Sequence, residues 1–264
     1  RRRTRGNIQP SGFCNNCVSD NVSQVSTFEG DISRRTSMSS NSSAWAEHQA
    51  TTALLLDWDD TLFPTTWLLD DVGIEWDKSI LSQLPAGSRC KYIATLMDKF
   101  ENKVAQFLTE ARKSTTIFIV TLAGEGWVES AISTFMPSLR QVFEECNIKV
   151  IYAQEHASPA LKAAVESEIV KAGPANCTLD VWSQVKADAV FNVLKDEGNW
   201  RSIISIGDSD FERFGTFEAA RRFFQCDNKD DACSNGKSQP WIKTLKLLDD
   251  PTAEELTAQL TMLR

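Results

Sequence analysis

The chain lacks the features of a membrane protein, a histidine-dependent hydrolase and a disulfide-stabilised fold. None of its apolar runs approaches the roughly 20 residues that a membrane-spanning helix requires, so we expect a soluble protein with no membrane partner. It holds only two histidines, His48 and His156, and no Gly-x-Ser-x-Gly motif, which argues against a serine or cysteine hydrolase. Its seven cysteines are an odd number without a dense framework, so we expect reduced thiols in an intracellular compartment.

The chain also lacks a surplus of basic residues. Its formal net charge is −8, and residues 1–52 hold six arginines and four acids, which leaves −10 on the remainder. This acidic body argues against a broad nucleic-acid-binding surface, and we expect no nucleic-acid partner. The first residue is Arg rather than Met, so the N-terminus looks truncated. We therefore expect an intracellular, cytoplasmic protein and leave organelle targeting open.

The pattern of the chain changes near residue 50. Residues 1–50 are rich in Ser, Asn, Arg and Gly and show no sustained periodicity, which predicts a disordered tail. From residue 51 to residue 264, apolar segments alternate with amphipathic ones, which predicts an α/β domain: a three-layer sandwich around a parallel sheet. The expected strands are 53–57, 116–120, 148–152, 202–206 and, with a weaker pattern, 242–246. The expected helices are 89–113, 127–146, 159–172, 179–196, 211–223 and 252–263, with a polar surface insertion at 227–239.

The most informative segment is the end of the first expected strand. The apolar run Ala53-Leu54-Leu55-Leu56 is followed at once by Asp57-Trp58-Asp59-Asp60-Thr61. Four apolar residues suit a strand that is buried on both faces of a parallel sheet, and open α/β sheets bind their ligands at the carboxyl ends of such strands. Acids crowded in this way repel one another unless a cation, or a phosphate-bound cation, occupies the site.

Two later strands also end in polar residues. Thr121 closes one of them and precedes the turn Gly124-Glu125-Gly126, where a hydroxyl and backbone N–H groups can meet an anion. Asp208 directly follows another strand, although alone it is as well explained as a helix cap. Lys186 lies 22 residues before Asp208, which is one helix plus one strand, so it is expected to return to the same edge. Oxygen ligands from Asp57, Asp59 and Asp208 favour Mg²⁺ as the cation.

In this order, the residues resemble a known family. Asp57-x-Asp59-x-Thr61, then Thr121, Lys186 and Gly207-Asp208-x-x-x-Glu212 are similar to the four-motif series of the haloacid dehalogenase (HAD) superfamily, in its phosphatase branch. The resemblance covers residues 52–263, and its first and last motifs are the specific ones. Glu212 departs from the pattern because an Asp is more usual there, and the lysine is assigned by spacing alone, with Lys195 as the alternative.

The resemblance implies a role for each residue. Asp57 would attack phosphorus and form an aspartyl-phosphate, and Asp59 would act as general acid and then general base. Thr121 and Lys186 would hold the phosphoryl oxygens. The implied metal ligands are Asp57, Asp59 through its backbone carbonyl, Asp208 and Glu212, directly or through water. Since a carboxylate at the position of Asp59 distinguishes phosphate-ester hydrolysis from phosphoenzyme trapping, we expect a phosphatase, with a phosphomutase as a weaker option.

The spacing of the motifs limits the cover over the site. The 55 residues between Thr61 and Ile117 and the 64 between Thr121 and Lys186 leave room for a small cap or none. An uncovered site favours a phosphoprotein as substrate. Trp67 and Trp76, in the flap that follows the first motif, could still shape a small-molecule pocket, so we expect either a phosphoprotein or a small phosphorylated molecule.

Two rival functions are less well supported by the sequence. A catalytically silent binding or regulatory protein on the same fold would have no reason to keep repelling carboxylates. A nucleotide-binding P-loop ending in Gly236-Lys237-Ser238 would need a glycine at Asp231 and a preceding strand, and it has neither.

Overall fold

The computed structural model describes residues 52–76, 78–172, 179–197, 200–230 and 241–263. The expected disordered tail, residues 1–50, lies outside the described residues, as does most of the expected insertion at 227–239. The strands are β1 (Thr52–Leu56), β2 (Thr116–Thr121), β3 (Lys149–Tyr152), β4 (Ser202–Gly207) and β5 (Trp241–Lys246). The helices are η1 (Trp67–Val72), α2 (Ile80–Gln83), α3 (Ser88–Ala111), α4 (Trp127–Phe135), α5 (Leu139–Glu145), α6 (Ala153–His156), α7 (Pro159–Ala172), α8 (Leu179–Glu197), α9 (Asp210–Asp230) and α10 (Ala253–Met262).

The described strands form one parallel sheet in the order β3-β2-β1-β4-β5. The first strand lies at its centre, where Leu56 is level with Ile119 of β2 and Ile206 of β4. The backbone N–H of Asp57 continues this ladder by donating to the carbonyl of Ile206 at 3.0 Å. All carboxyl ends therefore face one edge, and the predicted α/β fold with a parallel sheet is confirmed.

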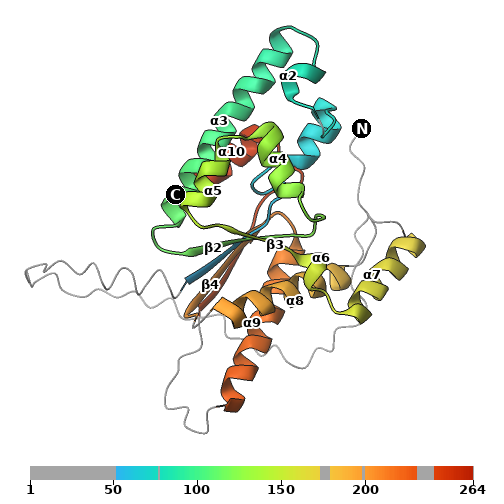
Figure 1. The fold of residues 1–264 in the computed structure, drawn as a ribbon, viewed down its shortest axis with the longest axis vertical. Coiled ribbons are helices and arrows are strands. Elements are labelled where there is room, and N and C mark those ends of the chain that lie inside the picture. The colour runs from blue at the N-terminus through green and yellow to red at the C-terminus, as the bar shows by residue number, and fades with distance from the viewer. Residues whose placement is uncertain (1–51, 77, 173–178, 198–199, 231–240, 264) are drawn as a thin grey trace, which may run out of the picture. The chain divides into compact units, whose positions relative to one another are not determined.

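Each face of the sheet packs against its own layer of helices. Alternation along β1 sends Leu54 and Leu56 to one side and Ala53 and Leu55 to the other. The first side packs against α3, α4, α5 and α10, and the second against α6, α7, α8 and α9 (Figure 1). Since both faces are covered, the interiors of β1 and β2 are wholly apolar, whereas the edge strand β5 is half polar and largely exposed.

Two predicted helices differ from the observed ones. The expected helix 127–146 is wrong as a single element, because α4 ends at Phe135 and α5 begins at Leu139, on either side of Pro137. Proline lacks the N–H that a helix interior needs, and its ring clashes with the preceding turn. The last helix before β5 was expected at 211–223 but runs from Asp210 to Asp230, so the first residues of the expected insertion are helical.

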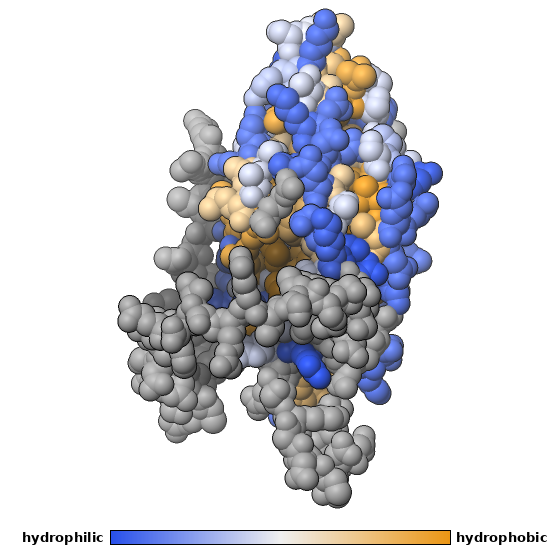
Figure 2. All heavy atoms as spheres, turned by 90° about the vertical axis from the view of Figure 1, so that its left-hand side faces the viewer, coloured by the Kyte–Doolittle hydropathy of each residue, from blue (hydrophilic) through white to orange (hydrophobic). Residues whose placement is uncertain are grey.

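The segment between β1 and β2 forms no separate cap domain among the described residues. It folds as η1, α2 and α3, of which α3 packs against α5 and α10 beside the sheet. The surface seen in Figure 2 is mainly hydrophilic where it is described, with smaller hydrophobic areas between. No described helix has the length and apolar character needed to cross a membrane.

Candidate active site

The predicted site residues meet at the carboxyl edge of the three middle strands. Asp57 directly follows β1, Thr121 is the last residue of β2, and Asp208 directly follows β4. The register of β1 with both neighbours is what brings these residues to one edge. Thr121 is fully buried, and Asp57 is 8% exposed.

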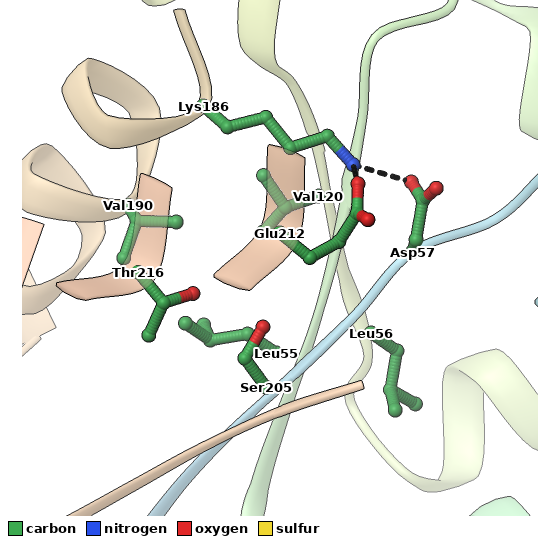
Figure 3. A pocket seen from close by; sticks show the side chains of 9 residues that line it. All are labelled: Leu55, Leu56, Asp57, Val120, Lys186, Val190, Ser205, Glu212 and Thr216. Carbon is green, nitrogen blue, oxygen red and sulfur yellow. Dashed lines mark hydrogen bonds and ion pairs between the residues drawn. The ribbon is translucent and has the colours of Figure 1, made fainter. Parts of the chain in front are cut away.

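Lys186 lies at the centre of this group. Its ammonium donates to Oδ1 of Asp57 at 2.7 Å and to Oε1 of Glu212. Figure 3 shows the Lys186 and Glu212 side chains extending from their helices toward Asp57. The Lys186 side chain is only 3% exposed, whereas the alternative lysine, Lys195, is exposed. The structure therefore places Lys186, and not Lys195, beside the expected nucleophile.

Glu212 is fixed at the start of α9 by the residues around it. Its Oε2 accepts hydrogen bonds from the backbone N–H and the hydroxyl of Ser209, at 3.0 and 2.6 Å. This return from the third helical residue to the residue before the helix is half of a capping box. The longer side chain thus reaches both Ser209 and Lys186, so each of its oxygens has a partner.

Two glycines give Glu212 and Lys186 the space they occupy. A Cβ at Gly207 would lie 2.2 Å from Cγ of Glu212, so any side chain there would displace the glutamate. A Cβ at Gly215 would lie 2.9 Å from Cβ of Lys186 and 3.0 Å from the Ser183 carbonyl. Glycine at these positions lets Glu212 lie against the end of β4 and lets α8 and α9 pack closely.

Asp59 is held apart from this network by three other donors. Its Oδ1 accepts from the Thr65 hydroxyl at 2.5 Å and from the indole N–H of Trp127 at 2.9 Å. Its Oδ2 faces the Thr121 hydroxyl at 3.4 Å, and that hydroxyl also accepts from the Ala123 N–H at 3.0 Å. The sequence had predicted Asp59 and Thr121, but it had assigned no role to Thr65 or Trp127.

Asp60 stabilises the turn that follows β1. Its backbone has a φ of 52°, and its carboxylate accepts from the N–H and hydroxyl of Thr66 at 2.9 and 2.5 Å. Thr61 contributes to the same turn through its N–H, while its buried hydroxyl has no hydrogen-bond partner among the described residues.

Burial and crowding shift the pKa values of the charged groups in the site. Burial raises the pKa of Asp57 well above its ordinary value of 3.8; Lys186 opposes this shift, and neighbouring carboxylates reinforce it. Burial also raises the pKa of Asp208 to about 7, and Glu212 adds to the shift. Burial alone would lower the pKa of Lys186, but its two carboxylate partners raise it. Glu212 has a lowered pKa in spite of its burial, because Lys186 and Ser209 bind its charged form.

The carboxylates of Asp57, Asp208 and Glu212 fit a divalent cation in chemistry and spacing. Each offers an oxygen, and these oxygens lie within 4.8 Å of one another. Hard oxygen donors are those that Mg²⁺ prefers. The carboxylate of Asp59 is not part of this cluster.

Two hollows bear on where a ligand could lie. A cavity of about 10 Å³ beside Asp57, Lys186 and Glu212 is lined by apolar side chains together with Ser205 and Thr216 (Figure 3), and it has room for about one water molecule. A larger hollow of about 550 Å³ lies at the opposite edge of the sheet. It is lined by residues at the starts of strands, among them Thr52, Ser202 and Trp241, and by none of the predicted site residues.

The chain was also compared with known proteins. No family model, no curated protein and no solved structure matches it.

Proposed function

We propose that the protein is a Mg²⁺-dependent phosphatase of the HAD type, which hydrolyses a phosphate monoester through an aspartyl-phosphate on Asp57. The observation that supports this proposal best is the charge balance at the carboxyl edge. Asp57 and Glu212 share the ammonium of Lys186, the Asp208 carboxylate lies close to both of them, and the pKa of Asp57 and of Asp208 is raised. A cation and a phosphoryl group bound through it would relieve this repulsion.

The metal would be held by Asp57 and Asp208, with Glu212 close enough to assist. When bound, Mg²⁺ would supply positive charge to the phosphoryl oxygens and favour the ionised form of Asp57. Lys186 keeps the Asp57 carboxylate in place through a 2.7 Å hydrogen bond and offsets part of its charge. Glu212 holds Lys186 from the opposite side.

Thr121 would bind the phosphoryl group, and Asp59 beside it would protonate the leaving oxygen. The hydroxyl of Thr121 and the N–H groups of the turn after β2 can donate to its oxygens. Asp59 lies next to Thr121, in position to give a proton to the leaving oxygen and later to take one from the hydrolytic water.

The proposed substrate is a phosphorylated protein or an exposed small phosphoester. The described residues between β1 and β2 and between β2 and β3 fold as helices of the same domain, so we infer a lightly covered site. The acidic character of the chain, with a net charge of −8, disfavours polyanions such as nucleic acids.

The rival function is a silent binding protein that holds a cation or a phosphate group without turnover. It would use the same carboxylate cluster, so binding of Mg²⁺ alone does not distinguish the two proposals. Only release of phosphate distinguishes them.

The test is phosphate release from a panel of phosphoesters and phosphopeptides, with Mg²⁺ or with EDTA. We expect Mg²⁺-dependent turnover that Asp57→Asn reduces at least about 1,000-fold, because no nucleophile remains. Asp60→Asn is the matched control, since it removes a neighbouring carboxylate whose contacts lie in the turn. Turnover that survives Asp57→Asn would refute the assignment, and a folded protein that binds Mg²⁺ but hydrolyses nothing would favour the silent rival.

A further inference from the structure

The carboxylate of Asp59 is restrained unevenly. Oδ1 accepts two short hydrogen bonds, from Thr65 at 2.5 Å and from the Trp127 indole at 2.9 Å. Oδ2 has a single long contact, 3.4 Å, with the Thr121 hydroxyl. One oxygen is therefore anchored, and the other is directed toward the residue proposed to bind phosphate.

Trp127 is itself fixed by its backbone and by its neighbours. It begins α4 directly after Gly126, whose φ of 82° is readily adopted by glycine. Its indole packs edge-on against Trp76, with ring centroids 5.1 Å apart, and against Phe63, at 6.0 Å. The aromatic cluster thus sets the direction in which the indole N–H points.

The two anchors come from different parts of the chain. Thr65 belongs to the loop after β1, and Trp127 lies 68 residues beyond Asp59 in sequence. Trp127 donates to Asp59, whereas Lys186 donates to Asp57 and Glu212. Trp127 can therefore act on the proton-transfer step without touching the nucleophile.

We propose that Trp127 is a positioning residue that holds Oδ1 of Asp59 so that Oδ2 addresses the leaving oxygen of the substrate. This inference rests on the proposed function. In the step concerned, a carboxylate oxygen of Asp57 forms a bond to phosphorus while the bond from phosphorus to the leaving oxygen breaks. That oxygen keeps the electron pair and takes the proton from Oδ2, so an alcohol departs and Asp59 is left as a carboxylate.

The experiment uses two substrates of similar size that differ in their need for a proton. The leaving group of p-nitrophenyl phosphate departs readily as an anion, whereas that of p-nitrobenzyl phosphate is an alkoxide that requires protonation. We compare kcat/KM for wild type, Trp127→Phe and the control Trp200→Phe, which removes an indole N–H that donates to the Leu194 carbonyl in the core on the other face of the sheet. Trp127→Phe keeps the ring and removes the N–H donor.

We expect Trp127→Phe to lower kcat/KM about 10- to 100-fold on p-nitrobenzyl phosphate, mainly through kcat, and less than about threefold on p-nitrophenyl phosphate. Trp200→Phe should change both substrates by a similar, small factor. Thr65→Val removes the other donor to Oδ1 and should reproduce the substrate-dependent loss of kcat/KM. Thr65→Ser keeps a hydroxyl and should retain the wild-type kcat/KM on both substrates.

The outcomes separate the inference from the function on which it rests. Suppose that the wild type releases phosphate and that Asp57→Asn abolishes the release. If Trp127→Phe then lowers kcat/KM equally on both substrates, or not at all, the role of Trp127 is overturned and the phosphatase function stands. A wild-type protein that releases no phosphate from either substrate would overturn the proposed function and this inference with it.

Discussion

Replacing Lys186 by methionine would remove the ammonium and keep a side chain of similar length. The side chains of Lys186, Asp57 and Glu212 are 3%, 11% and 7% exposed, so bulk water offers the stranded carboxylates little solvation. Asp57 and Glu212 would remain as buried carboxylates with no opposite charge in contact.

The magnitude follows from breaking a buried ion pair on one side. Such changes cost about 3–5 kcal/mol of unfolding free energy, a large part of the roughly 5–15 kcal/mol that stabilises a typical domain. The wild-type Glu212 has a lowered pKa, so its stabilising contribution is present above its unfolded pKa and is lost as the pH falls. In Lys186→Met the stranded carboxylates would bind protons more tightly when folded, so the variant loses stability as the pH rises. The difference between the two proteins should therefore be largest near pH 7.5 and smaller near pH 5.

Urea unfolding in EDTA at these two pH values measures the effect. Lys195→Met is the matched control, because it removes an exposed lysine from the same helix, and we expect a change within about 0.5 kcal/mol. If Lys186→Met does not fold, Glu212→Gln, which keeps the shape of its side chain, provides a milder form of the test. A loss below about 1 kcal/mol for Lys186→Met, or a loss that does not depend on pH, would refute the reasoning.

Two other predictions concern the surroundings of this network. Gly207→Ala should cost about 1–3 kcal/mol of unfolding free energy, because its Cβ would lie 2.2 Å from Cγ of Glu212. A double-mutant cycle with Glu212→Ala should recover most of this cost, and additive losses would exclude the clash. In EDTA, the free energy of unfolding should fall as the pH rises from about 5 to 7. Burial raises the pKa of Asp60 to about 6 and of Asp208 to about 7, so the folded state binds protons more tightly than the unfolded chain. Mg²⁺ should reverse the fall and Asp208→Asn should reduce it; stability that rises over this range in EDTA would contradict the assignment.

The layout of the fold could be predicted from the sequence because the middle strands β1, β2 and β4 are mainly apolar and covered on both faces, whereas the partly polar, exposed edge strand β5 has a weaker pattern. Each predicted strand overlaps an observed one and differs by a residue or two at its ends. The predicted helix 127–146 was wrong for a reason visible in the sequence, since Pro137 interrupts it. The short helices η1, α2 and α6 were not predicted, because elements of four to six residues carry too little periodicity.

The site could be predicted only in part. The parallel sheet brings the ends of its strands together, but it does not determine which atoms the side chains there contact. Strand ends predicted Asp57, Thr121 and Asp208, and spacing alone predicted Lys186. The motif Ser-x-x-Glu at the start of α9 was available as a signal for the backbone contact of Glu212, although not for its contact with Lys186. No local pattern could have revealed the Trp127 contact, which depends on tertiary packing between residues far apart in sequence.

The position of Glu212 links two properties that are usually separate. It belongs to the first turn of α9, and the same side chain is the counter-charge of Lys186. The first turn of a helix is where fraying ordinarily begins at little cost, because its N–H groups have no partners within the helix. In this protein the turn cannot fray without also separating a buried ion pair. The N-terminal end of α9 would otherwise be among the first parts of the domain to open. Its opening here requires the Glu212–Lys186 ion pair to break, so we expect this helix end to resist local unfolding.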